Sequence, residues 1–270
     1  MTGVKEVIRV KDGDTVKDHA VELEYTRHGP VVARKNGKAY VFRIPYAEEI
    51  GLGEQTYKMI TARNITEMKQ ALSMLQLMMQ NLMIGTVDGD IYYVRNGRVP
   101  VRPAGFDYKR AMPGNTSQAE WQGIHKFDDL VQILNPPQGY MQNCNVSPQF
   151  LMKDCPLKPS PQHPYLFNGF TSFEQEAYDN PLHQRAAMCQ ELLHNAKKMT
   201  VEDAIEVALS PAVYGVDAWQ DRLRKAWVGA SAEVRRNADL AKFYEVIVNW
   251  NRRCDANATG AVAYKYWKEA

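Results

Sequence analysis

The amino-acid sequence predicts a protein of the α+β class, because strand-like and helix-like segments occupy separate parts of the chain. In the first third, β-branched and aromatic residues alternate with polar ones between tight-turn pairs. Residues 103 to about 165 are rich in loop-forming residues, and helical character begins near residue 171. A layered α/β sheet is the alternative that the same order of segments allows.

Two hairpins are expected in the strand-rich part. Asn36-Gly37 predicts a type I′ turn, because both residues tolerate positive φ values. Asp88-Gly89 is a second tight-turn pair. The predicted strands around these turns cover residues 5–13, 19–29, 30–44, 81–87 and 91–102.

Helices are predicted at several places along the chain. Thr66 is the expected N-cap of one helix, and Asp128 and Asp129 are expected to cap the apolar, helix-like stretch that follows them. Thr200–Asp203 resembles a capping box, and residues 239–254 read as an amphipathic helix. The face of the first helix is expected to carry Met68, Ala71, Leu72, Leu75, Met78 and Met79.

This order of segments predicts two regions. Residues 1–165 form the sheet-forming part with a long loop, and residues 166–270 form a helical region. A loop as long as 103–165 inside a compact domain is usually functional.

The composition excludes several classes of partner. Lys and Arg total 33 against 31 Asp and Glu, a net charge of +2, so neither nucleic acid nor an anionic membrane is expected as a partner. No apolar run is long enough to cross a bilayer, and the N-terminus has no signal-peptide pattern.

The sequence contains few recognisable catalytic groups. No metalloprotease HExxH, nucleophile-elbow GxSxG or phosphate-binding glycine loop occurs, and the six histidines are scattered. His28 is expected to be a turn histidine bonded to the backbone. Of the four cysteines, Cys144 and Cys155 are close enough in sequence to pair under oxidising conditions, whereas four free, mostly buried thiols are the simpler expectation.

The stretch PPQGYMQNCNVSP, residues 136–148, stands out because Asn143 and Asn145 flank Cys144. An asparagine side chain offers an uncharged N–H donor, and one such donor in an oxyanion hole contributes roughly 3–4 kcal/mol to transition-state stabilisation. Asparagine is also a common turn residue, so a structural role is the alternative.

Three segments in fixed order resemble the penicillin amidase family. They are RHGPVV at 27–32, VDGDIYYVRNGRVPVR at 87–102, and EWQGIHKFDDLVQILNPPQGYMQNCNVSP at 120–148. The family includes penicillin and cephalosporin acylases and N-acyl-homoserine lactone acylases. The resemblance extends over about residues 5–200, and more loosely to the C-terminus.

The resemblance implies an N-terminal-nucleophile hydrolase with an αββα sandwich and, here, an appended helical region. In such enzymes the N-terminal serine of the large chain attacks an amide carbonyl, and its own α-amino group serves as the base. The second asparagine of the family's loop pattern donates to the oxyanion, which implies this role for Asn145. Asn143 would be its neighbour, and Arg185 matches an arginine that supports the site.

The resemblance further implies that this chain is an internal part of the large (beta) chain. The nucleophile would then lie upstream, so the isolated chain is expected to be inactive without the small chain and the nucleophile segment. Complete family members are periplasmic or secreted, and their substrates are small N-acyl amides. Their calcium site draws mostly on upstream residues. A backbone carbonyl near Tyr108 is the part that would remain, so neither a metal nor another cofactor is assigned.

Two alternatives remain at this point. Removal of Met1 would expose Thr2, and an N-terminal threonine can act as nucleophile and base together. The chain could also be a non-catalytic, degenerate module that binds an acyl ligand or a partner subunit through the 103–165 loop.

Overall fold

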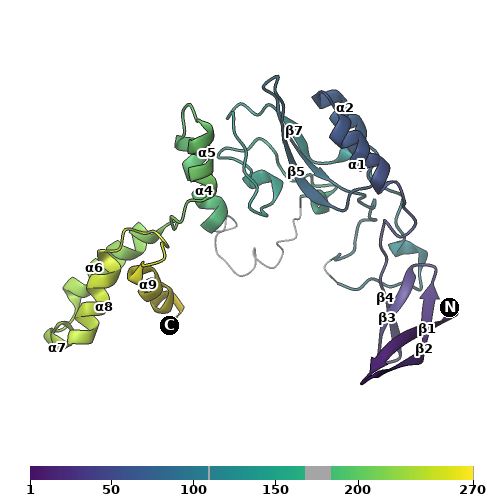
Figure 1. Ribbon diagram of the computed structural model, residues 1–270, viewed down its shortest axis with the longest axis horizontal. Helices are drawn as coiled ribbons and strands as arrows, with labels where there is room; N and C mark the ends of the chain where they lie inside the picture. Colours follow the sequence, from purple (N-terminus) through teal and green to yellow (C-terminus); the bar gives the residue numbers. More distant parts are fainter. Residues whose placement is uncertain (109, 168–183, 270) are drawn as a thin grey trace. The chain divides into compact units, whose positions relative to one another are not determined.

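The computed structural model describes residues 1–108, 110–167 and 184–269 (Figure 1). Its contacts divide the chain into two compact units. The first comprises Met1–Leu82 and Arg95–Leu130, and the second comprises Met83–Val94 and Val131–Ala270. Strands and helices occupy separate stretches, which confirms the α+β class. None of the helices in these ranges is both long and apolar enough to span a membrane.

The first unit begins with a four-stranded sheet of order β1-β2-β3-β4, antiparallel throughout. Asn36 and Gly37 connect β3 to β4 with φ values of 52° and 70°, which confirms the predicted type of hairpin turn. The strands are β1 (Thr2–Asp12), β2 (Thr15–Thr26), β3 (Gly29–Lys35) and β4 (Lys38–Val41).

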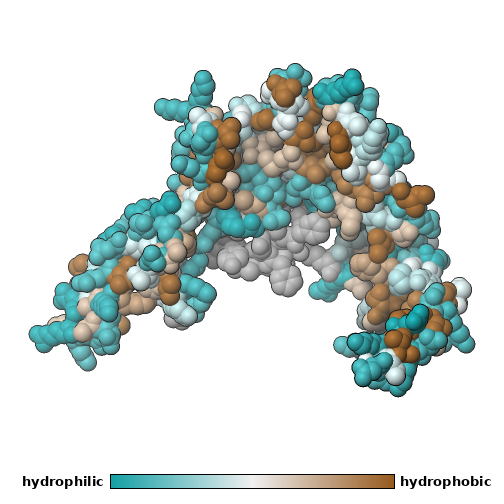
Figure 2. Space-filling model, in the orientation of Figure 1, coloured by the Kyte–Doolittle hydropathy of each residue, from teal (hydrophilic) through white to brown (hydrophobic). Residues whose placement is uncertain are grey.

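The side chains of this sheet are unusually exposed for their apolar character. Every residue of β1 is exposed, and Val7 keeps 62% of its surface accessible. Figure 2 shows hydrophobic residues at the surface of this sheet. The sheet is therefore held together by its backbone ladder and surface pairs such as Arg34–Glu24 rather than by a buried core. The exposed apolar side chains include Val4, Val7, Ile8, Val10, Val16 and Leu23.

Two short helices follow, α1 (Leu52–Thr61) and α2 (Ile65–Leu72). The predicted cap at Thr66 is wrong: Asn64 has the extended backbone of an N-cap, and its side chain accepts a hydrogen bond from the Glu67 N–H. The predicted apolar face is also too long, because the helix ends at Leu72 and Leu75 has a left-handed φ of 53°.

A second sheet has the order β5-β6-β7, with β5 (Gln80–Gly85), β6 (Ile91–Asn96) and β7 (Gln132–Leu134). The hairpin predicted around Asp88-Gly89 is confirmed by β5 and β6. The helix-like stretch predicted after Asp129 is wrong, because a single 3₁₀ turn (η2, Phe127–Asp129) leads into β7. Strand pairing with the buried residues of β6 overrides the local helical pattern.

The core of the second unit anchors the loop that follows β7. Tyr93 of β6 packs with Leu151, Met152 and Cys155, all at most 4% exposed. Cys155 is buried, and its thiol donates to the Pro148 carbonyl at 3.3 Å. The residues after the asparagine motif are therefore fixed by packing although they form only 3₁₀ turns.

The helices of the second unit begin, among the described residues, at α4; the start predicted near residue 171 lies outside those residues. The capping box at Thr200 and Asp203 is confirmed by two reciprocal hydrogen bonds. The helix predicted over 239–254 is shorter, because α8 ends at Val248. The helices are α4 (Gln184–Asn195), α5 (Val201–Ala208), α6 (Val216–Gly229), α7 (Ala232–Arg236), α8 (Ala238–Val248) and α9 (Thr259–Glu269).

Gln220 connects α6 to the end of α8. Its side chain is 1% exposed and donates to the carbonyls of Ile247 and Trp250, both at 2.9 Å, while it accepts from Arg252 at 3.1 Å. One amide thus satisfies two buried carbonyls where the helical pattern stops.

We expect Gln220→Leu to lower the free energy of unfolding of the helical region by about 2 kcal/mol, because both carbonyls lose their donor in a buried place. Urea unfolding followed by circular dichroism measures this loss. Lys225→Ala, an exposed change on the same helix, is the matched control and should have little effect. Equal stability of the Gln220→Leu protein and the control would contradict the assignment.

Candidate active site

The asparagine loop, residues 142–146, is built on a buried glutamine. Gln142 is 3% exposed, and its backbone N–H donates to the Leu151 carbonyl at 2.8 Å. Its side-chain Nε2 donates to the Phe150 carbonyl at 2.7 Å, and its Oε1 accepts from the Cys144 N–H at 3.0 Å. This stretch of backbone belongs to no sheet, so the side chain of Gln142 provides the hydrogen bonds that a neighbouring strand would otherwise provide.

Asn143 closes the turn itself. Its Oδ1 accepts from the Asn145 N–H at 2.9 Å, and its Nδ2 donates to the Val146 carbonyl at 3.2 Å. Both ends of this amide are thus used within the loop, in the manner of an Asx turn. Asn143 therefore has a structural role within the loop.

Asn145 is presented differently. Its φ of 67° lies in the left-handed region, which asparagine tolerates better than most residues, and its side chain is exposed. Nη2 of Arg185 donates to Asn145 Oδ1 at 3.2 Å and to the Cys144 carbonyl, also at 3.2 Å. The structure thereby brings together the two site residues predicted from the sequence, which lie 40 positions apart.

This contact determines which way the Asn145 amide points. A guanidinium can only donate, so the atom facing Arg185 must be Oδ1, and Nδ2 faces the other way. Within the described ranges, no residue accepts a hydrogen bond from Asn145 Nδ2. The loop therefore presents an uncharged N–H donor whose orientation is set by a cation behind it.

Helix α4 is also fastened to the segment that follows the loop. Nε2 of Gln190 donates to the Phe150 carbonyl at 2.7 Å, the same carbonyl that accepts from Gln142. Ala186 and Ala187 are buried, so the small side chains next to Arg185 allow close packing. Sequence reasoning missed Gln142 and Gln190, because a glutamine that satisfies a carbonyl leaves no pattern in the sequence.

His28 and the carboxylate of Glu120 have structural roles in the first unit. His28 Nε2 lies 3.1 Å from the Gly114 carbonyl, which confirms a turn histidine bonded to the backbone. Glu120 pairs with Arg27 and Arg43, each at 2.9 Å. Its pKa is below the usual value: partial burial raises it, but the hydrogen bond from Arg43 and the charges of His28, Arg27 and Arg43 lower it by more.

Thr2, the alternative nucleophile, is the first residue of β1 and pairs with Tyr25 in the ladder. It is exposed. Its place as an ordinary strand residue offers no support for a catalytic role.

The four cysteines are thiols rather than disulfides in the part of the chain that the structure describes. They are not mostly buried, because only Cys155 is buried; Cys144 and Cys189 are half-buried and Cys254 is exposed. The Cys144 thiol is close enough to Cys189 to affect the ionisation of Cys189. Burial, together with the Cys144 thiol, raises the pKa of Cys189 to about 11.

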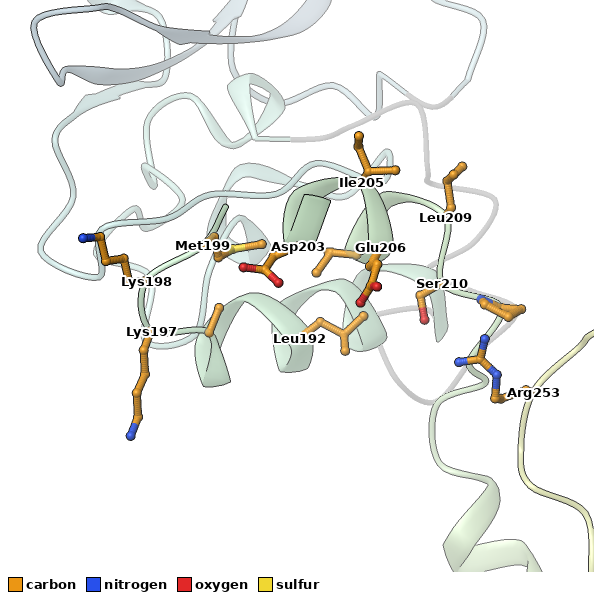
Figure 3. Close-up of a pocket in the computed structure, with 13 residues that line it drawn as sticks. Leu192, Lys197, Lys198, Met199, Asp203, Ile205, Glu206, Leu209, Ser210 and Arg253 are labelled. Carbon is orange, nitrogen blue, oxygen red and sulfur yellow. The ribbon is translucent and has the colours of Figure 1, made fainter. Parts of the chain in front are cut away.

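One cavity lies away from the asparagine loop. It has a volume of about 750 Å³, is open to solvent, and is formed by α4, α5 and the segments around Pro211 and Arg253. In Figure 3, Asp203 and Glu206 extend from α5 on the side that faces α4. None of its lining residues belongs to the asparagine loop. Asp203 is already used in the capping box of α5.

The described residues include no cluster of side chains suited to a metal ion. Among residues 1–108, 110–167 and 184–269, no three His, Cys, Asp or Glu side chains gather in a way that could hold a cation. The Tyr108 hydroxyl donates to the Pro103 carbonyl. No step of the chemistry is assigned to a metal ion.

The chain is similar to known proteins in both sequence and structure. The penicillin amidase family profile matches residues 1–270. Penicillin G acylase from Escherichia coli is 38% identical over 88 residues, which cover 33% of this chain and 9% of that protein. The structure is similar to a thermostable penicillin G acylase from Alcaligenes faecalis, with a TM-score of 0.68 and 24% identity. That match covers 94% of this chain and 42% of the solved chain.

The structural match shows the fold of the penicillin acylases, and the family profile covers the full length of the chain. The chain belongs to the penicillin amidase family.

We expect Cys189 to react with iodoacetamide at pH 8 about 100-fold more slowly than a thiol with the ordinary pKa of 9.0, because only the thiolate reacts and the raised pKa keeps it protonated. Its rate should rise with pH until the pH approaches 11. Peptide mapping of a time course measures the rate, with exposed Cys254 as the internal reference. Alkylation of Cys189 as fast as that of Cys254 would contradict the assignment.

Proposed function

We propose that this chain supplies the oxyanion-binding half of an amide-hydrolysing active site, with Asn145 as the donor and Arg185 as its positioning residue. The observation that carries the proposal is the orientation of the Asn145 amide. Arg185 holds Oδ1 and leaves Nδ2 as an outward-facing donor. Asn143 lacks this freedom, because both ends of its amide are bonded within the loop.

The proposed reaction is acyl transfer from an amide to water. The hydroxyl oxygen of an N-terminal serine attacks the amide carbonyl carbon, and the α-amino group of that serine accepts the proton. Negative charge develops on the carbonyl oxygen, where Asn145 Nδ2 and a backbone N–H donate to it. Collapse of the intermediate expels the amine with the proton, and water then hydrolyses the acyl-enzyme.

Arg185 acts on this reaction through Asn145. A free asparagine side chain can rotate and present its oxygen, which would repel an oxyanion. The hydrogen bond from Arg185 disfavours that rotation, and its second bond to the Cys144 carbonyl ties the backbone of the same loop. The donor is thus preorganised before charge develops, which is the condition under which such donors are most effective.

The nucleophile is assigned to another part of the complete enzyme, so the isolated chain should not turn over substrate. Two observations support a partner segment made of the small chain and the nucleophile region. The chain spans 42% of the solved acylase chain it matches, and the β1–β4 sheet exposes apolar side chains that a partner would cover.

The proposed substrates are small N-acyl amides, either the acylated amine of a β-lactam or an acyl-homoserine lactone. Both present the same reacting group, a secondary amide carbonyl next to an apolar acyl chain. The names of the two similar acylases support the first of these classes. As family enzymes of this kind act outside the cytoplasm, we assign the complete protein to the periplasm or the exterior.

A precursor that joins this chain to the upstream part of a family acylase should hydrolyse a chromogenic acyl-anilide, whereas the isolated chain should not. In that precursor, Asn145→Ala should lower kcat by roughly 10²–10³-fold, because one oxyanion donor is lost. Asn257→Ala, an exposed asparagine elsewhere, is the matched control. Full activity of the Asn145→Ala enzyme would overturn the oxyanion assignment. Acyl-ligand binding without turnover by the joined protein would favour a non-catalytic module.

In the same precursor, Arg185→Ala should lower kcat about tenfold, the size expected for one lost charged hydrogen bond that positions the donor. Added guanidinium ion should restore part of the activity to Arg185→Ala and none to Asn145→Ala, because only the former keeps the donor. Arg236→Ala, an exposed change on α7, serves as control. A failure of guanidinium rescue, with the variant shown to be folded by circular dichroism, would contradict the positioning role.

A further inference from the structure

Cys144 and Cys189 lie on the two sides of the contact between the asparagine loop and α4. The Cys144 thiol contributes to the raised pKa of Cys189, so the two side chains are close although they are far apart in the sequence. The backbone explains the contact. Arg185 bonds the Cys144 carbonyl, and Cys189 lies four residues later, on the same face of α4 and one turn along.

A further hydrogen bond holds α4 in place beside Cys189, and the two thiols are accessible to small reagents. Gln190, next to Cys189, donates to the Phe150 carbonyl. Residues of α4 before and after Cys189 are therefore bonded to the loop or to the segment that follows it. Cys144 and Cys189 are both half-buried. Cys155, the nearer cysteine in sequence, is instead buried in the core with its thiol on the Pro148 carbonyl.

We propose that Cys144 and Cys189 are a disulfide-forming pair, oxidised by low-molecular-weight disulfides such as oxidised glutathione. The bond would tie the asparagine loop covalently to α4. This pairing replaces the one between Cys144 and Cys155 that sequence proximity suggests. Sequence distance is a poor guide here, because the fold brings Cys189 to Cys144 and turns Cys155 into the core.

The chemistry balances in two exchange steps. The Cys144 thiolate attacks one sulfur of oxidised glutathione, so an S–S bond forms to the protein and one glutathione thiolate leaves. The Cys189 thiolate then attacks the Cys144 sulfur, forming the internal bond and releasing the second glutathione. The two cysteine protons pass to the released thiolates. The protein loses two electrons, and glutathione disulfide gains them.

The order of attack follows from the surroundings of the two thiols. Burial first, and then the charge and hydrogen bond of Cys144, raise the pKa of Cys189 to about 11, so Cys189 is a poor first nucleophile. Once the Cys144 sulfur is part of a mixed disulfide, it no longer carries a charge. Two of the three causes that disfavour the Cys189 thiolate are then removed.

The test is a peptide map of the full chain after incubation with oxidised glutathione. Trypsin places Cys144 in peptide 127–153, Cys155 in 154–185 and Cys189 in 186–197, so each pairing gives a different product. We expect peptides 127–153 and 186–197 to be linked, and the protein to lose the mass of two hydrogen atoms. A link between 127–153 and 154–185, or glutathione on the cysteines without an internal bond, would overturn the proposal.

Variants in which one cysteine is replaced by serine provide a second test. Cys155→Ser and Cys254→Ser should still form the bond, while Cys189→Ser should retain glutathione on peptide 127–153, because no second thiol resolves the mixed disulfide. If Cys189→Ser fails to fold, the map of the unaltered chain decides alone. The thermal midpoint of the unaltered chain should rise on oxidation, since the bond closes a long loop. None of these measurements requires turnover, so the outcome is independent of the proposed hydrolase function.

Discussion

The candidate site depends on one hydrogen-bonding group, the Nη2 of Arg185, which donates to both the Cys144 carbonyl and Asn145 Oδ1. The first bond ties α4 to the backbone of the loop, and the second sets the direction of the Asn145 amide. Because a guanidinium has no acceptor, the contact admits only one amide orientation. A flexible, exposed asparagine is thereby converted into a directed donor without any charge of its own.

The loop around this contact is ordered by amides rather than by regular structure. Gln142 and Gln190 converge on the Phe150 carbonyl, and Asn143 spans from Asn145 to Val146. Buried backbone groups need partners, and side chains provide them where no strand is available. This network holds Asn145 in its left-handed backbone conformation. The segment that follows the loop is fixed in turn by the packed core around Tyr93.

The two units differ in how completely they bury their apolar residues. The second unit packs Tyr93, Leu151 and Met152 into a core beside the loop, whereas β1 in the first unit is exposed along its length. An antiparallel sheet normally buries at least one of its two faces against the rest of the protein. The contrast supports the proposal that another part of the enzyme covers the apolar surface of this sheet.

The sequence by itself determined the α+β class, both hairpins and the Thr200 capping box, because these depend on residues adjacent in the chain. Motif order identified the family, and the same resemblance pointed to Asn145 and Arg185. Predictions from local patterns were wrong where contacts with distant residues override them. Pairing with β6 makes residues 132–134 a strand, and α2 ends before Leu75, whose backbone is left-handed.

Only the tertiary structure decided which end of the Asn145 amide faces outward and which cysteine lies near Cys144. Both follow from docking α4 on the loop, and hydrogen bonds between segments some 40 residues apart leave no local pattern to read.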